Sequence, residues 1–184
     1  MRYCLIAFVM LLTGCSTSPV QRNRLLLPVL DVENLVCCWQ SQELLGIELQ
    51  GHQFELSSAI ALADGRLVVV ILDPLGQRLL TVNQRGIDVS IDTSREIPDK
   101  FPVDWLLLGV YLRYMPMSAW LFEGSEWQVY ESDGSRLLTW QGKPMIRMRS
   151  NSASQQSEDI DVSELYFSSL DMKVTVKVLS RLPL

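Results

Sequence analysis

The stretch HQFELSSAIALADGRLVVVIL, residues 52–72, decides the fold class. From His52 to Leu62, apolar residues recur at every second position, which is the period of a β-strand with one covered face. Ala63-Asp64-Gly65-Arg66 contains the Asp-Gly pair that is typical of a tight hairpin turn. Residues 67–72 are all apolar, which predicts a returning strand that is buried on both faces. The stretch therefore predicts an antiparallel β-hairpin.

Similar segments occur on both sides of the middle of the chain. Residues 79–82 and 87–91 predict two more strands around a turn at 83–86. Short strands joined by tight turns favour a mainly β (α+β) fold, a single antiparallel domain of about nine to eleven strands. The later strands are predicted over residues 126–131, 136–140, 145–149, 165–167 and 172–179, with an exposed polar loop over 150–163.

The middle of the chain departs from this pattern. Residues 103–114, VDWLLLGVYLRY, are apolar on nearly all sides and lie between Pro102 and Pro116. Proline suits the start of a helix and disfavours helix in the residue before it, so a helix is predicted over Val103–Tyr114. A helix that is apolar on most sides must be covered on most sides, and 12 residues are too few to cross a bilayer. We expect one or two apolar helices to plug the mouth or hollow of a curved sheet.

The N-terminus has the features of a bacterial lipoprotein signal peptide. A short positive start precedes an apolar run that is long enough for a signal peptide and too short to remain as a membrane span. The motif Leu12-Thr13-Gly14-Cys15 resembles the lipobox. This resemblance implies cleavage after Gly14, a diacylglyceryl thioether on Cys15 Sγ and an acyl group on the new amine. An ordinary secretory signal with an incidental cysteine is the alternative.

The predicted organisation is a signal peptide over residues 1–14, a lipidated polar tether over 15–24 and one domain over 25–184. Ser16 resembles the residue that permits outer-membrane sorting in enterobacterial lipoproteins. We therefore expect a lipid-anchored protein at the periplasmic face of the outer membrane. Three acyl chains make a firm anchor, because each buried CH₂ contributes about 0.8 kcal/mol.

Composition narrows the classes of function. A formal net charge of −5 argues against a nucleic-acid partner, because phosphate binding needs a basic patch. The single histidine, His52, lies in a polar turn, and the serines and acids of residues 150–163 indicate a solvated loop. Cys37 and Cys38 fit two small apolar strand residues better than a redox or metal site, since a disulfide between strand neighbours would be strained. We expect no enzyme activity, no metal and no cofactor apart from the lipid on Cys15.

Several motifs together resemble the outer-membrane lipoprotein receptor LolB. They are the lipobox, the meander, Pro74-Leu75-Gly76 between two apolar strands, the apolar helix and Trp127-Gln128-Val129-Tyr130. The chain is more similar still to a family of LolB-like lipoproteins with a Pro-Leu-Gly-Gln-Arg turn, here Pro74 to Arg78, and a leucine-rich helix. That helix tends to end in Trp-Pro, whereas this one ends in Tyr114-Met115-Pro116. The Gly-Leu-Pro turn of LolB is not reproduced after Gly109.

This resemblance implies an incomplete antiparallel β-barrel around an apolar cavity, with helices at its mouth. LolA and LolB carry the acyl chains of lipoproteins in that cavity. In LolB the leucine of the same tripeptide, Leu75 here, lies on a loop that helps to place cargo in the membrane, whereas the alternative for Leu75 is an ordinary exposed turn residue. Members of the closer family are often encoded beside fatty-acid-type or aryl polyene biosynthesis enzymes. The implied partners are a lipid or acylated cargo, and a periplasmic carrier or the lipid-biosynthesis machinery.

Apolar residues of the predicted strands and helix are the candidates for an acyl-binding cavity. Flexible and aromatic side chains are numerous, and methionine in particular can adapt to acyl chains of different shape. A well-filled core made of the same residues is the alternative. The candidates are Trp39, Leu67, Val69, Ile71, Trp105, Leu106, Val110, Trp120, Trp127 and Val129.

The sequence thus predicts a non-catalytic, lipid-anchored periplasmic protein that binds and transfers acyl chains or lipoproteins at the inner face of the outer membrane. The alternative is a structural or interaction lipoprotein with a filled barrel, which supports an envelope or lipid-biosynthesis complex. A cavity beneath the helix would favour the first hypothesis, and a filled interior would favour the second.

Overall fold

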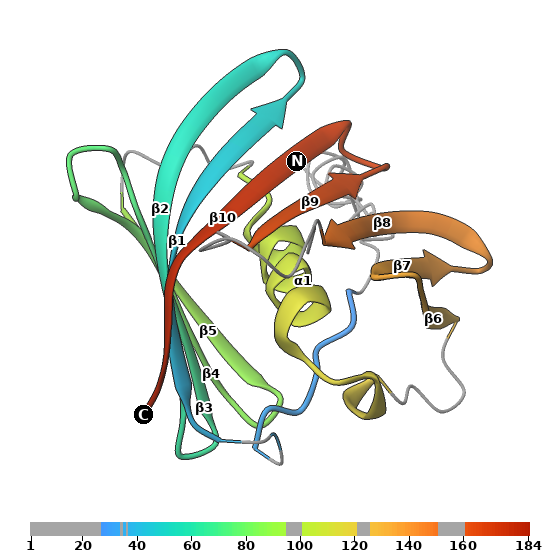
Figure 1. Cartoon of the computed structure of the whole chain (residues 1–184), viewed down its shortest axis with the longest axis horizontal. Coiled ribbons are helices and arrows are strands. Elements are labelled where there is room, and N and C mark those ends of the chain that lie inside the picture. Colours follow the sequence, from blue (N-terminus) through green and yellow to red (C-terminus); the bar gives the residue numbers. More distant parts are fainter. Residues whose placement is uncertain (1–26, 34, 36, 95–100, 121–125, 151–160) are drawn as a thin grey trace, which may run out of the picture.

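A curved antiparallel sheet surrounds one α-helix in the computed structural model of the chain (Figure 1). The structure describes residues 27–33, 35, 37–94, 101–120, 126–150 and 161–184. Cys15, the predicted signal peptide and tether, and most of the predicted loop over 150–163 lie outside these residues. Ten strands and one α-helix within the described residues make the fold mainly β, as predicted.

The strands follow the order β5-β4-β3-β2-β1-β10-β9-β8-β7-β6, and every neighbouring pair is antiparallel. Within the described chain, β5 and β6 are the two edges, so the sheet is open and barrel-like rather than closed. The strands are β1 (Trp39–Leu49), β2 (His52–Ala63), β3 (Arg66–Leu72), β4 (Arg78–Arg85), β5 (Asp88–Thr93), β6 (Trp127–Ser132), β7 (Ser135–Trp140), β8 (Lys143–Ser150), β9 (Val162–Phe167) and β10 (Met172–Pro183).

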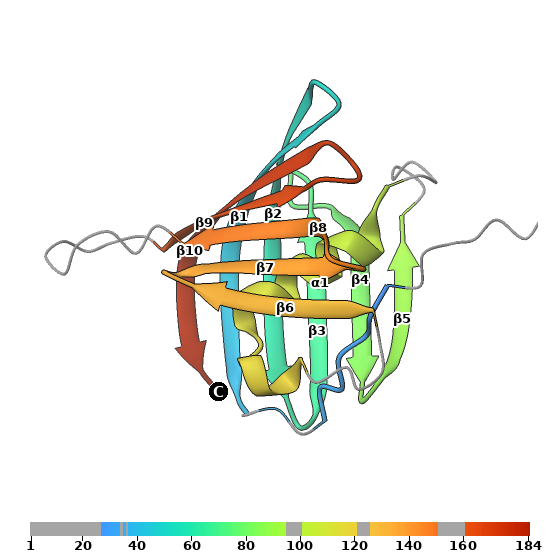
Figure 2. The same cartoon turned by 90° about the vertical axis from the view of Figure 1, so that its right-hand side faces the viewer.

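The helix α1 spans Val103–Tyr114, the residues predicted for it, and a short 3₁₀ turn follows at Met117–Ala119. Figure 2 shows β6, β7 and β8 on one side of α1 and the first strands of the sheet on the other. The apolar helix therefore lies in the hollow of the curved sheet, as its sequence predicted. It is too short to span a membrane, and no other described helix is long and apolar enough to do so.

The hairpin predicted from residues 52–72 is confirmed, because β2 and β3 pair in register up to Ala63 and Arg66. Asp64 and Gly65 both have positive φ, at 51° and 67°, as the tight Asp-Gly turn requires. The residues of β3 at positions 67, 69 and 71 are buried, whereas those at 68, 70 and 72 are half-buried. The prediction of burial on both faces is therefore wrong, because α1 covers only the concave face of the sheet.

Strand β4 includes residues 83–85 of the turn predicted at 83–86, so the predicted start of that turn is wrong. The chain turns instead at Gly86 and Ile87, directly before β5. The reason is the Gln84 side chain, which is 1% exposed and points toward the interior. Its Nε2 donates to Leu30 O at 2.5 Å and to Gly86 O at 2.8 Å, while its Oε1 accepts from the Tyr111 hydroxyl at 2.5 Å. These tertiary bonds satisfy a buried amide in an extended strand, where the local sequence pattern predicts a turn.

Cys37 and Cys38 precede the sheet, whose first residue is Trp39. The structure joins the two cysteines in a disulfide across a cis peptide bond. The prediction that both are strand residues is therefore wrong, because β1 begins at Trp39. The alternation that places neighbours on opposite faces holds only within the strand ladder, and these residues lie outside it.

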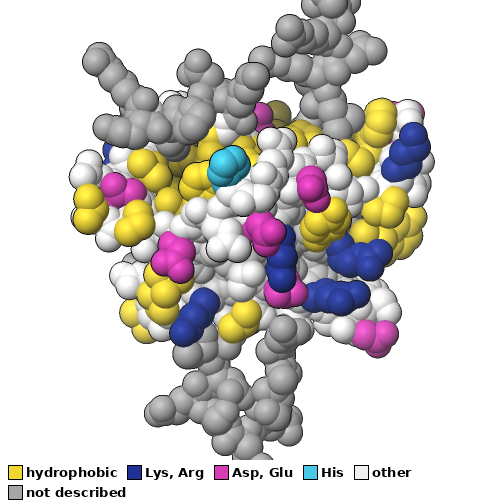
Figure 3. Space-filling view, turned by 90° about the horizontal axis from the view of Figure 1, so that it is seen from above, with side chains coloured by type: hydrophobic (Ala, Val, Ile, Leu, Met, Phe, Trp, Pro, Cys, Tyr) yellow, Lys and Arg dark blue, Asp and Glu magenta, His cyan; other side chains and the backbone are white. Residues whose placement is uncertain are grey.

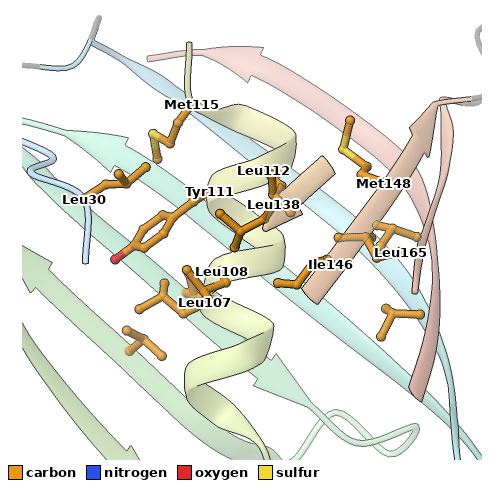
Figure 4. Packing of buried hydrophobic residues seen from close by; sticks show 14 of the residues in the cluster. Leu30, Leu107, Leu108, Tyr111, Leu112, Met115, Leu138, Ile146, Met148 and Leu165 are labelled. Atoms are coloured by element: carbon orange, nitrogen blue, oxygen red, sulfur yellow. The ribbon is translucent and has the colours of Figure 1, made fainter. Parts of the chain in front are cut away.

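Side chains of α1 fill much of the hollow (Figure 4). Leu107, Leu108, Tyr111 and Leu112 are buried against apolar residues of other elements, which include Leu30, Leu138, Ile146 and Leu165. Through the helix, the core thus connects strands from both ends of the sheet order.

Gly109 of the helix packs closely against β9. A Cβ atom at this position would lie 3.1 Å from Leu165 Cδ2 and 3.3 Å from Phe167 Cζ. Both distances are shorter than an ordinary carbon–carbon contact. The close packing of α1 on β9 therefore favours a residue without a side chain at this point in the helix.

Candidate functional site

A small cavity lies between α1 and the concave face of the sheet. Its volume is about 40 Å³, which exceeds the roughly 10–15 Å³ needed to hold one water molecule and is far below the roughly 150 Å³ that holds benzene. Inward-facing residues of β1, β2, β3, β4, β9 and β10 line it, together with the α1 residues between Val103 and Arg113 that face the sheet. All lining side chains are apolar except those of Glu43, Ser58 and Arg113.

These polar side chains form a buried cluster near the C-terminal end of α1. Arg113 Nη1 donates to Glu43 Oε1 at 2.7 Å, and the two side chains are 5% and 2% exposed. Ser58 Oγ donates to Glu43 Oε2 at 3.0 Å, and the Tyr114 hydroxyl donates to Oε1. Ser41 Oγ lies 3.5 Å from Glu43 Oε1 and 3.1 Å from the Tyr114 hydroxyl. The carboxylate of Glu43 is therefore fully partnered, as a buried charge requires.

One donor of this cluster has no acceptor. Arg113 Nε is buried and makes no hydrogen bond with the residues that the structure describes. Buried polar atoms without partners are rare, and leaving one unsatisfied costs about 1–3 kcal/mol. The donor belongs to a side chain that lines the cavity.

Burial also affects the two tyrosines of the helix. It raises the pKa of Tyr111 well above the ordinary value of its hydroxyl, and the hydrogen bond with Gln84 opposes this effect. Burial raises the pKa of Tyr114 to about 12, the nearby charge of Arg113 opposes the shift and Glu43 adds to it. Both hydroxyls are therefore neutral at physiological pH and can donate hydrogen bonds to the sheet.

The two halves of α1 are held in different ways. Tyr111 and Arg113 bond to β4 and β1, and Arg136 of β7 donates Nη1 to Leu112 O at 2.9 Å and to Met115 O at 2.6 Å. Arg136 thereby satisfies carbonyls at the helix C-terminus and places a positive charge at the negative end of the helix dipole. Between residues 103 and 110, in contrast, no side chain forms a hydrogen bond or ion pair with the described residues. Among the described residues, apolar packing alone holds that half of α1.

Four of the ten predicted cavity residues line the cavity. Val69 and Ile71 face it from β3, and Leu106 and Val110 face it from α1. Leu67 is buried on the same face of β3 but does not line the cavity. The apolar strand and the apolar helix were thus the informative signals.

The other predicted residues pack elsewhere in the core or at its margin. The tryptophans pair with other rings at separations typical of aromatic packing, which agrees with the alternative of a filled core. Between ring centroids, Trp39 lies 4.4 Å from Tyr114, Trp105 lies 6.4 Å from Phe167, Trp120 lies 6.4 Å from Tyr111 and Trp127 lies 6.4 Å from Trp140, while Val129 is half-buried on β6.

Sequence reasoning missed the polar residues of the site. Glu43 occupies an inward position of β1, between buried Ser41 and buried Leu45. In β2 its partner in the register is Ser58, which also faces inward. In two paired strands, a polar residue at a position where the alternation expects an apolar one is the signal that could have found this pair. Arg113, the only basic residue of the helix, is the matching signal in α1.

The turn between β3 and β4 presents Leu75 to solvent. Asp73 Oδ1 accepts hydrogen bonds from the backbone N–H groups of Leu75 and Gln77, both at 2.8 Å. Gly76 has a φ of +79°, which lets the chain reverse there. Leu75 is 81% exposed at the tip of this well-bonded turn.

No metal site emerges from the described part of the chain, because it contains no group of three or more His, Cys, Asp and Glu side chains able to hold an ion. His52 begins β2 and is exposed, on a face where hydrophobic, acidic and basic side chains are interspersed (Figure 3). Its position matches the predicted polar turn.

A family model described as "Protein of unknown function (DUF3261)" matches residues 40–168. The chain belongs to this family. The DUF3261 segment runs from the second residue of β1 to the residue directly after β9. It includes α1, the Glu43–Arg113 pair and the Leu75 turn, whereas β10 lies outside it. A search of curated proteins finds no match.

Proposed function

We propose that this protein binds acyl chains between α1 and the concave face of the sheet. The observation that carries the proposal is the apolar cavity at this interface, which has one polar cluster at its end. Pockets for lipid-like ligands have the same character, a mostly apolar lining with a few placed polar groups. The LolB-like resemblance of the sequence supports the same function.

Binding requires the N-terminal half of α1 to move. A volume of about 40 Å³ is much smaller than the roughly 150 Å³ cavity that holds a single benzene molecule. Within the described part of the chain, apolar contacts alone hold residues 103–110, and an acyl chain could replace those contacts with others of the same kind. The polar anchors of Tyr111 and Arg113 would keep the C-terminal half in place. Exchange of chains would then be nearly isoenergetic and driven by mass action.

We further propose that the protein acts as a lipid-anchored, LolB-like carrier or receptor at the inner face of the outer membrane. The lipobox-like motif before Cys15 supports the anchor, and the exposed Leu75 on its hydrogen-bonded turn supports a contact with lipid. The cargo is a lipid or an acylated molecule. No catalytic step is required for this function.

The test is acyl-chain uptake by the full chain with Cys15→Ala, which cannot be lipidated at that residue. Native mass spectrometry should detect one bound lipid, and a fluorescent fatty-acyl probe should bind with saturation. Val110→Phe should weaken uptake because the larger side chain occupies the cavity, whereas Val129→Phe, at another half-buried valine outside the lining, should not. Absence of both bound lipid and probe uptake in the parent chain would refute the proposal.

The small size of the cavity favours a second candidate function. In that case the interior is permanently filled, and the protein is a structural or interaction module whose partner binds the open edge at β5 or β6. This candidate predicts no acyl uptake. It also predicts that changes on the edge strands abolish function, while truncation of interior leucines only lowers stability.

A further inference from the structure

The polar cluster in the cavity has a specific electrostatic balance. Glu43 and Arg113 carry opposite charges at 2.7 Å, and both side chains are nearly fully buried. Arg181, another cation near this cluster, is exposed and lies over the rings of Trp39 and Tyr114. Solvent screens the charge of Arg181. The charges of Glu43 and Arg113 therefore nearly cancel within the cluster when no ligand is bound.

This balance disfavours an anionic ligand in the cavity. An ionised carboxylate next to Arg113 would compete with Glu43 for one guanidinium and would leave a net negative charge in an apolar site. Buried charges without a partner are strongly unfavourable. A neutral oxygen acceptor adds no charge and leaves the bond between Glu43 and Arg113 intact.

The unpartnered donor identifies what the cluster lacks. Arg113 Nε is buried, has no acceptor among the described residues and belongs to a side chain that lines the cavity. The side chain is 5% exposed, and its Nη1 already bonds to Glu43. A carbonyl oxygen that arrives with an acyl chain would satisfy Nε and remove the cost of a buried unsatisfied donor.

We propose that Arg113 Nε binds the neutral carbonyl of an acyl ester or amide, so that the cavity selects ester- or amide-linked acyl chains over ionised fatty acids. This inference rests on the proposed acyl-binding function and specifies its ligand class. Arg113 is then a specificity-determining residue, and Glu43 holds its guanidinium in position.

Competition between two ligands with the same acyl chain tests the inference. The full chain with Cys15→Ala is loaded with a fluorescent acyl probe, which is displaced at pH 9 by 1-palmitoylglycerol or by palmitate, both below micellar concentrations. The ester should displace the probe at a concentration at least about tenfold lower than the ionised acid, because only the acid carries a charge into the cavity. Equal displacement by both ligands would overturn the inference and leave the proposed function standing. Failure of the probe to bind would overturn both.

Arg113→Lys separates Nε from the positive charge. Lysine keeps a cation beside Glu43 but has no equivalent of Nε, so the ester preference should fall to within about threefold. Arg78→Lys is the matched control, since Arg78 is exposed on β4 outside the cavity, and it should keep the full preference. An unchanged preference in Arg113→Lys would overturn the assignment of Nε.

A spectroscopic readout does not depend on how the variant folds. The infrared band of a ¹³C-labelled ester carbonyl should move to lower frequency when 1-palmitoylglycerol binds the parent chain, relative to the same ester in hydrocarbon solvent. A band at the hydrocarbon position in the bound state would show that no donor contacts the carbonyl, and the assignment would be overturned.

Discussion

Replacing Glu43 by glutamine should destabilise the protein severely. The carboxylate accepts hydrogen bonds from Arg113, Ser58 and Tyr114 and is 2% exposed. Glutamine has nearly the same shape and keeps an oxygen acceptor, so the main change is the loss of the negative charge. The guanidinium of Arg113, 5% exposed, would remain buried without a counter-charge. Breaking a buried ion pair in this way lowers the free energy of unfolding by about 3–5 kcal/mol.

Urea unfolding of the full chain with Cys15→Ala, monitored by tryptophan fluorescence at pH 7, measures this loss. The double variant Glu43→Gln/Arg113→Gln has no buried charge, and its free energy of unfolding should return to within about 2 kcal/mol of the parent value. Asp92→Asn is the matched control, because the Arg78–Asp92 pair is as short, at 2.5 Å, but its side chains are 46% and 69% exposed. That change should cost less than about 1 kcal/mol.

The reasoning would be refuted if Glu43→Gln cost as little as the surface control. It would also be refuted if the double variant were as unstable as the sum of the two single variants. Either result would mean that the guanidinium of Arg113 is not dependent on Glu43 in the folded state.

Four further predictions concern other parts of the molecule. Leu75→Glu should reduce flotation of the protein with phospholipid vesicles by about tenfold or more, because one exposed leucine no longer enters the bilayer. Ile87→Glu, at another exposed turn, should have little effect on flotation. Equal loss of flotation in both variants would contradict a specific contact at Leu75. Gly109→Ala should lower the free energy of unfolding by about 1–2 kcal/mol, because crowding against β9 exceeds the gain in helix propensity, and a more stable variant would disprove the close packing. Because the pKa of Tyr114 is raised to about 12, stability should be unaffected by this group below pH 10 and should fall by up to about 1.4 kcal/mol per pH unit above it; urea unfolding at pH 9 and pH 11 should show a smaller loss in Tyr114→Phe. Cys15→Ser should abolish labelling of the protein by radioactive palmitate in cells, and persistent labelling would exclude the predicted anchor.

The parts of the fold that the sequence predicted well have strong local signals. Two prolines bracket α1, and its boundaries at Val103 and Tyr114 agree with the prediction. The Asp-Gly pair likewise predicted the position of the turn between β2 and β3. Strand β1 was not identified, because its inward positions include Ser41 and Glu43, which interrupt the apolar alternation. Only the packing of α1 onto the sheet explains why polar residues occupy those positions.

The polar cluster of the site could not be assembled from local pattern. Glu43 and Arg113 lie 70 residues apart, and they meet because α1 occupies the hollow of the sheet. The same placement brings Tyr111 to Gln84, whose buried amide extends β4 into the segment predicted as a turn. The apolar lining, in contrast, alternates along β3, and Val69 and Ile71 were predicted only as apolar residues of a strand expected to be buried on both faces. Sequence periodicity thus indicates which faces are covered, whereas tertiary contacts decide where polar groups can be buried.

Photo-crosslinking with an acyl ester tests the central claim most directly. The probe carries a diazirine near the terminal methyl of its acyl chain, and the crosslinked peptides are identified by mass spectrometry. An acyl chain between α1 and the sheet predicts crosslinks to residues 103–110 and to β3 at Val69 and Ile71, and excess 1-palmitoylglycerol should suppress them. Crosslinks confined to the outer surface, or unaffected by the competitor, would contradict acyl binding beneath α1.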